Sequence, residues 1–189
     1  MLILDISPKP YTLVPHPELP LLWEAPQGTD RGIYLWCVEV EGLYLVNYLG
    51  KTWSQGGFAA RLKQELTLWF SEEERIDLTL FKRGVRRFLP PESCTPDARA
   101  AEEAALLPLY RILLITLDSH ELTRRVEGTL IRTLASNPAT HQFLCNKDKH
   151  RECTTIPLGF SSCSAPVLGL NAPVPEWLSE RLRGDGAHG

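Results

Sequence analysis

Four polar side chains in this chain are of types that could act together on a charged ligand. Glu127 lies within the apolar stripe of a predicted helix, where a carboxylate is costly unless it is paired or binds a metal ion. Arg61 lies on an earlier predicted helix, and its planar guanidinium could hold two oxygens of a phosphate. Tyr34 and Tyr48 lie on predicted strands and combine an aromatic body with a polar hydroxyl. These residue types indicate a metal ion or a phosphate as the ligand.

Each of these residues also has a purely structural explanation. Glu127 could pair with an arginine such as Arg61, or could lie at the solvent edge of a slightly rotated helix. Arg61 is one helical turn before Glu65 and could form an ordinary surface ion pair with it. Tyr34 and Tyr48 could be strand residues whose rings fill the core. Residue types alone leave both explanations open.

A β-hairpin over residues 33–49 must position the two tyrosines. Residues 33–40 and 43–49 are rich in β-branched and aromatic residues, and they flank a turn at Glu41-Gly42. The sequence therefore predicts two antiparallel strands joined by a short loop.

The length of that loop decides which faces the tyrosines occupy. A two-residue loop places Tyr34 opposite Leu49, so that Tyr34 and Tyr48 point to opposite faces of the sheet. A three-residue loop, with Gly42 in the left-handed conformation, places Tyr34 opposite Tyr48 on one face. If both tyrosines serve one site, the three-residue loop is favoured.

Two helices and one further strand complete the expected core. Apolar residues repeat at helical spacing over 57–70 and again over 119–135, and Ser119 can cap the second helix. Residues 111–117, RILLITL, indicate a buried strand. The expected fold is α+β: a small mixed β-sheet of hairpin 33–49 and strand 111–117, flanked by the two helices.

The chain length suits one domain with extensions. Residues 1–30 are rich in proline and are expected to form an N-terminal arm. Residues 31–153 would form the domain, with an insertion at 71–110. Residues 154–189 are rich in proline and serine at their start and would form a C-terminal extension.

Composition limits the class of protein. No apolar run approaches about 18 residues, so no membrane span is expected. The five cysteines are an odd number without a regular framework, which favours free thiols in a reducing cytoplasm. The formal net charge of −3 is not that of a strong nonspecific nucleic-acid binder. Any contact with nucleic acid must use local basic patches, and the candidates are Lys82, Arg83, Arg86, Arg87 and Lys147.

The order of motifs along the chain resembles the GIY-YIG nuclease superfamily. Gly32-Ile33-Tyr34 opens the first strand of the hairpin, and Tyr48-Leu49-Gly50-Lys51-Thr52 closes the second. A helix arginine, a helix glutamate and a late loop asparagine follow in the family order, as Arg61, Glu127 and Asn146. The resemblance covers residues 31–146.

The resemblance implies roles for these residues. Glu127 would be the main protein ligand of one Mg²⁺ (or Mn²⁺), since one carboxylate plus several waters suits Mg²⁺. The two tyrosines would flank the attacking water, with Tyr48 favoured as general base because Lys51 could lower the pKa of its phenol; metal-bound hydroxide is the alternative base. Arg61 would stabilise charge on the phosphoryl oxygens. Asn146 would organise the site, although the loop alignment also allows Asn137.

Two features depart from the family pattern. Many members carry a histidine or tyrosine one turn after the helix arginine, where this chain has Glu65. Glu65 could be a second metal ligand, could pair with Arg61, or could mark weakened catalysis. The insertion 71–110 is longer than in compact members, and the basic residues at 82–87 within it are expected to contact phosphates.

The expected function is therefore divalent-metal-dependent endonucleolytic cleavage of DNA, by a restriction-type or a structure-selective (repair) enzyme. One alternative is a nucleic-acid-binding module of the same fold with weakened catalysis. Another is an RNA nuclease, because the motifs contact phosphate and do not report the sugar.

Overall fold

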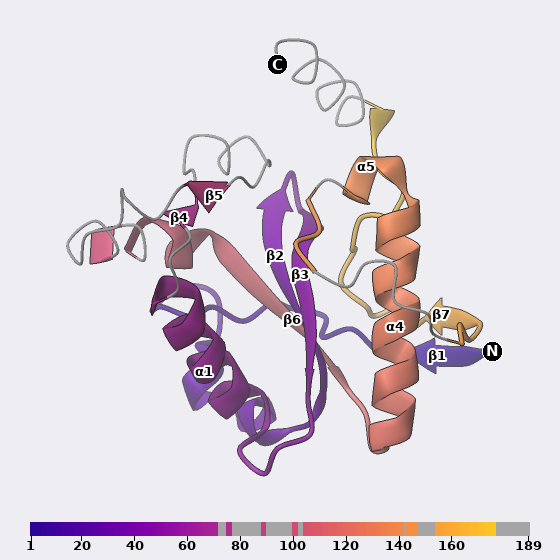
Figure 1. The fold of residues 1–189 in the computed structure, drawn as a ribbon, viewed down its shortest axis with the longest axis horizontal. Helices are drawn as coiled ribbons and strands as arrows, with labels where there is room; N and C mark the ends of the chain where they lie inside the picture. The colour runs from indigo at the N-terminus through magenta and orange to yellow at the C-terminus, as the bar shows by residue number, and fades with distance from the viewer. Residues whose placement is uncertain are drawn as a thin grey trace.

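The computed structural model describes residues 1–71, 75–76, 88–89, 100–101, 104–141, 143–146 and 154–176 (Figure 1). Most of the predicted insertion 71–110 lies outside these ranges. So do all the candidate basic residues: Lys82, Arg83, Arg86, Arg87 and Lys147.

The main sheet has three strands in the order β3-β2-β6. β2 (Gly32–Val40) is central and runs antiparallel to both β3 (Leu43–Thr52) and β6 (Tyr110–Thr116). The prediction of a mixed sheet is therefore wrong, while the α+β class is confirmed. β3 and β6 run in the same direction, but β2 lies between them, so they form no parallel ladder with each other.

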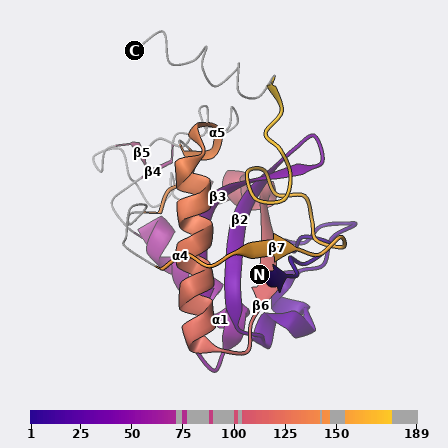
Figure 2. The same cartoon turned by 90° about the vertical axis from the view of Figure 1, so that its right-hand side faces the viewer.

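Two helices cover the two faces of this sheet (Figures 1 and 2). α1 (Gly57–Ser71) packs Phe58 and Leu62 against one face, which includes Trp36 of β2. α4 (His120–Ser136) packs its buried stripe against the other face. Ser119 caps α4 by accepting a hydrogen bond from the Leu122 backbone N–H at 3.3 Å. The two predicted helices are thus confirmed to within one residue at each end.

The hairpin turn has two residues, not three. Glu41 and Gly42 have φ values of 51° and 78°, and Val40 pairs with Leu43, as in the left-handed two-residue turns typical of hairpins. The favoured three-residue loop is therefore wrong.

A β-bulge nevertheless brings the tyrosines to one face. The register shifts between Trp36 and Cys37, because Asn47 of β3 is an extra residue without a partner on β2. Tyr48 then pairs with Trp36, and Tyr34 lies two residues further along the same face. The bulge therefore places Tyr34 and Tyr48 on one face of the sheet, as the three-residue loop was expected to do.

The arm and the extension pack on the edges of the sheet. Tyr11 exchanges two backbone hydrogen bonds with Ile112 of β6, at 2.8 and 2.9 Å. At the other edge, the Leu168 N–H donates to the carbonyl of Tyr44 in β3 at 2.9 Å. These contacts cover parts of both edge strands.

Short elements complete the fold. A parallel pair joins β1 (Leu2–Leu4) to β7 (Leu158–Phe160), and an antiparallel pair joins β4 (Arg75–Ile76) to β5 (Phe88–Leu89). Short helices within the described residues are η1 (Leu22–Glu24), η2 (Pro26–Thr29), η4 (Leu107–Leu109) and α5 (Pro138–His141).

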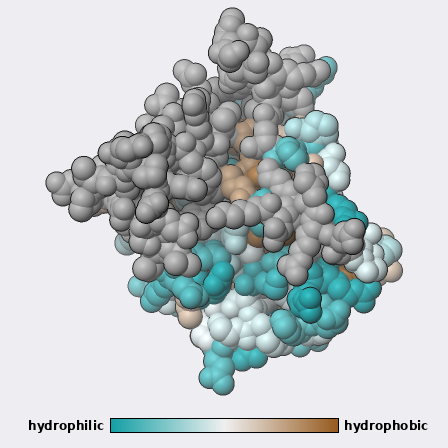
Figure 3. All heavy atoms as spheres, in the orientation of Figure 1, coloured by the Kyte–Doolittle hydropathy of each residue, from teal (hydrophilic) through white to brown (hydrophobic). Residues whose placement is uncertain are grey.

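The surface shown in Figure 3 is mainly hydrophilic where residues are described, with a small apolar area near its centre. Within the described ranges, no helix combines the length and the apolar character that crossing a membrane requires.

Candidate active site

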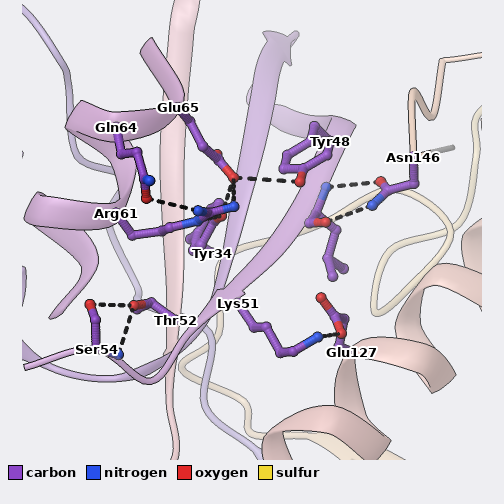
Figure 4. A network of polar contacts seen from close by, with 11 residues as sticks. Tyr34, Tyr48, Lys51, Thr52, Ser54, Arg61, Gln64, Glu65, Glu127 and Asn146 are labelled. Carbon is purple, nitrogen blue, oxygen red and sulfur yellow. Dashed lines mark hydrogen bonds and ion pairs between the residues drawn. The ribbon is translucent and has the colours of Figure 1, made fainter. Parts of the chain in front are cut away.

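A buried carboxylate joins the two tyrosines to the helix arginine (Figure 4). The Tyr34 hydroxyl donates to Glu65 Oε1 at 2.5 Å, and the Tyr48 hydroxyl donates to the same oxygen at 3.4 Å. Arg61 Nη2 lies 3.1 Å from that oxygen as well. Because Arg61 and Glu65 are one turn apart on α1, both side chains face the tyrosines from the same helix face.

The other nitrogens of Arg61 are also engaged. Nε donates to the Tyr34 hydroxyl at 3.3 Å, and Nη1 donates to Gln64 Oε1 at 2.9 Å. The Arg61 side chain remains 35% exposed, whereas the Glu65 side chain is only 3% exposed. A ligand arriving from solvent can therefore reach the guanidinium but not the carboxylate.

A second charged pair lies on the opposite face of β3. Lys51 pairs with Ile33 in the hairpin register and so points toward α4, where its ammonium forms an ion pair with Glu127 Oε2. Figure 4 shows no contact to the other carboxylate oxygen of Glu127 from the residues drawn. The structural alternative in which Glu127 pairs with Arg61 is not observed, because the two lie on different sides of the edge strand.

The charges of both clusters affect the pKa of Tyr48. Burial, together with the charges of Glu65 and Glu127, raises the pKa of Tyr48 to about 12, although the charge of Arg61 opposes the shift. The Lys51 ammonium is paired with Glu127 instead. The prediction of a lowered pKa for the Tyr48 phenol is therefore wrong, because that pKa is raised.

Burial also sets the charge states around Glu65. It raises the pKa of Tyr34 further than that of Tyr48, and the Glu65 charge adds to this. Burial raises the pKa of Glu65 itself, although the hydrogen bond from Tyr34 and the charge of Arg61 oppose the shift. For Arg61, burial alone would lower the pKa, but the hydrogen bond with Tyr34 and the nearby acidic groups raise it overall. Arg61 is thus held as a cation.

Asn146 holds the edge strand between Tyr48 and Gly50. Its Oδ1 accepts from the Leu49 backbone N–H at 3.1 Å, and its Nδ2 donates to the Leu49 carbonyl at 2.6 Å. Asn137, the alternative, follows α4 and accepts from the Ala139 N–H at 3.0 Å instead. Between the two asparagines, the structure places Asn146 beside the tyrosines.

Among the candidate site residues, Glu127 offers a carboxylate oxygen to a metal ion. In the part of the chain that the structure describes, no group of three or more His, Cys, Asp or Glu side chains could hold one. A hydrated Mg²⁺ or Mn²⁺ needs as little as one carboxylate from the protein, and Glu127 fits that need through the oxygen that no residue drawn in Figure 4 contacts. Glu65 does not fit as a second ligand, because its carboxylate is buried among Tyr34, Tyr48 and Arg61.

The central position of Glu65 and the contact from Gln64 were not predicted. Their spacing three and four residues after Arg61 is a helical signal that pointed to contact with Arg61, but not with the tyrosines. The tyrosine contacts depend on the bulge at Asn47.

Comparison with known proteins adds nothing to this geometry: no protein-family model, no curated protein and no solved structure matches the chain.

Proposed function

We propose that the protein is a divalent-metal-dependent endonuclease that hydrolyses phosphodiester bonds in DNA. The observation that carries the proposal is the position of Tyr48 at the edge strand. It lies in the cluster of Tyr34, Arg61 and Glu65 on one face of β3, while the ion pair of Lys51 with Glu127 lies on the other face.

Arg61 would bind the scissile phosphate. Its guanidinium is charged, partly exposed and fixed by Tyr34, Gln64 and Glu65, so it offers a preorganised cation for the growing charge on the phosphoryl oxygens. Glu127 would hold the cation, which when bound supplies Lewis-acid stabilisation of the phosphoryl group. Lys51 would then move from Glu127 to a phosphate oxygen.

Tyr48 would pass on the proton of the attacking water. With a pKa raised to about 12, its phenol is neutral near pH 7 and cannot be a phenolate base. As the water oxygen bonds to phosphorus, the water proton would go to the Tyr48 oxygen while the Tyr48 proton goes to Glu65 Oε1. The raised pKa of Glu65 makes it a better proton acceptor than an exposed carboxylate. The departing sugar oxygen would take a proton from solvent.

Substitution of Glu127 tests the proposal. We expect Glu127→Ala to abolish cleavage of plasmid, branched and single-stranded DNA in Mg²⁺ or Mn²⁺, while circular dichroism shows a folded protein. Glu121→Ala is the matched control, since Glu121 is exposed on the first turn of the same helix. Undiminished cutting by Glu127→Ala would overturn the metal assignment. An RNA substrate in the same panel tests the RNA nuclease alternative.

A second candidate is a nucleic-acid-binding module of the same fold with weakened catalysis. It is favoured by charge pairing at both halves of the site: Glu65 neutralises Arg61, and Lys51 neutralises Glu127. Tight DNA binding by the wild-type protein, with no cleavage in either metal, would favour this candidate over the enzyme.

A further inference from the structure

Three side chains stack where β3 ends. The guanidinium carbon of Arg31 lies 5.6 Å from the centroid of the Trp53 ring. The rings of Trp53 and His120 are stacked, with centroids 5.7 Å apart and an interplanar angle of 27°. Arg31 directly precedes β2, Trp53 directly follows β3, and His120 is the first residue of α4. The stack therefore joins three segments that are distant in sequence.

The stack lies on the same side of the sheet as Glu127. Trp53 stacks on His120 of α4, and α4 is the helix that carries Glu127 and covers that face. His120 and Glu127 are two helical turns apart on α4, roughly 10 Å along the axis. The contact of Trp53 with His120 and the ion pair of Lys51 with Glu127 thus connect β3 to α4 at two successive levels.

This part of the surface is polar and accessible. His120 and Arg124 are exposed, whereas Trp53 and Arg31 are half-buried. Arg124 is one turn after His120 and one turn before Glu127, so a cation lies between them along the helix. The lower part of the face in Figure 3, where Figure 1 shows the end of β3 and the start of α4, is largely hydrophilic. That part of the face shows no broad apolar patch in Figure 3.

In the part of the chain that the structure describes, the hydrogen bonds to the outer edge of β3 end before Lys51. Asn47 and Leu49 make hydrogen bonds to residues 143–146 on the outer side of the strand. Among the described residues, no backbone hydrogen bond reaches the outer side of Lys51.

We propose that this surface, made of Arg31, Trp53, His120 and Arg124, binds an unpaired nucleotide of the DNA substrate. The base would stack on the exposed imidazole of His120, which the Trp53 indole supports from behind, and Arg124 would bind a neighbouring phosphate. This inference rests on the proposed function, since it places the bound base relative to Glu127. A separation of about 10 Å along α4 equals roughly three stacked nucleotide steps.

The proposal narrows the substrate class. A base inside a duplex is covered on both faces by its neighbours and cannot stack on a protein ring unless it is unstacked. Single-stranded, flapped or forked DNA offers such a base without that cost. The enzyme would accordingly be structure-selective and not of the restriction type.

Binding measurements in EDTA test this without any cleavage. We expect fluorescence anisotropy to show tighter binding of the wild-type protein to forked DNA than to a blunt duplex of the same sequence. His120→Ala should weaken binding to the fork roughly 5- to 150-fold, the effect of losing one base–aromatic stack. His120→Phe, which keeps a ring, should restore most of the affinity. Glu121→Ala, at the exposed neighbouring position, should leave it unchanged.

The outcomes separate this inference from the proposed function. Equal wild-type affinity for fork and blunt duplex, full fork affinity in His120→Ala, or failure of His120→Phe to restore binding would overturn the stacking site. If Glu127→Ala still abolishes cleavage in that case, the nuclease assignment stands alone. If His120→Ala loses fork binding and the wild-type protein never cuts DNA, the stacking site stands and the nuclease assignment falls.

Discussion

The Tyr34 phenol lies directly over the backbone of Gly50, its partner across the hairpin. A Cβ at residue 50 would lie 2.3 Å from the Tyr34 hydroxyl oxygen and 2.4 Å from the ring carbon that carries it. No side chain other than hydrogen leaves room for the ring. Gly50 thus allows Tyr34 to cross the edge strand and reach Glu65.

Gly50→Ala should therefore displace Tyr34. We expect a loss of about 1–3 kcal/mol in the free energy of unfolding, as for other overpacked cores, together with a large loss of cleavage. Urea denaturation and a plasmid assay measure the two effects. Gly42→Asn is the control, because a Cβ at Gly42 meets no atom within 4 Å and asparagine tolerates its left-handed conformation. Wild-type stability and activity in Gly50→Ala would contradict this role.

Local patterns in the sequence predicted the helices and strands that carry the site. α1, α4 and β6 begin and end within one residue of the predicted 57–70, 119–135 and 111–117. Apolar spacing is a property of neighbouring residues, so it can be recognised without knowledge of distant contacts.

The bulge could not be predicted in this way, because residues distant in the sequence form hydrogen bonds with it. The Asn47 carbonyl accepts from the Cys145 N–H at 2.7 Å, and Asn47 Nδ2 donates to the Phe143 carbonyl at 3.3 Å. The ion pair between Lys51 and Glu127 likewise joins residues 76 positions apart. The sequence indicated candidate residues, but neither the central position of Glu65 nor the pairing of Lys51 with Glu127.

Glu65→Gln should change how stability depends on pH. Burial raises the pKa of Glu65 above its ordinary 4.5, so the folded protein binds this proton more readily than the unfolded chain. That stabilisation is complete below pH 4.5 and is lost as the pH rises through the folded-state pKa. Glutamine stays neutral throughout. The free energy of unfolding of Glu65→Gln minus that of the wild type should thus increase with pH and then level off.

Urea denaturation between pH 4 and pH 8 measures this difference. Glu41→Gln removes the same charge at the exposed tip of the hairpin and is the matched control. A difference for Glu65→Gln that stays flat, or that decreases as the pH rises, contradicts a raised pKa for the buried carboxylate.

Lys51→Met should strengthen metal binding at Glu127. The Lys51 ammonium competes with a metal ion for the Glu127 carboxylate. Its removal also relieves the repulsion between the ammonium and the bound metal ion. The pair is partly exposed, so we expect only a gain of about two- to fivefold in Mn²⁺ affinity, measured by titration calorimetry. Lys9→Met, at an exposed position in the arm, is the control for net charge. Unchanged or weaker Mn²⁺ binding by Lys51→Met would show that Lys51 does not compete for the metal site.

Asn146→Ala should loosen the edge strand at the site. Both hydrogen bonds to Leu49 would be lost and buried backbone groups left without partners, which costs about 1–3 kcal/mol. Hydrogen exchange at the Leu49 amide should accelerate, and cleavage should fall because Tyr48 and Gly50 flank Leu49. Asn171→Ala is the matched control: its side chain bonds the Val167 N–H at 2.7 Å and the Ala165 carbonyl at 2.9 Å, away from the tyrosines. If both variants lose equal stability and equal activity, Asn146 contributes only to general stability and does not position the site.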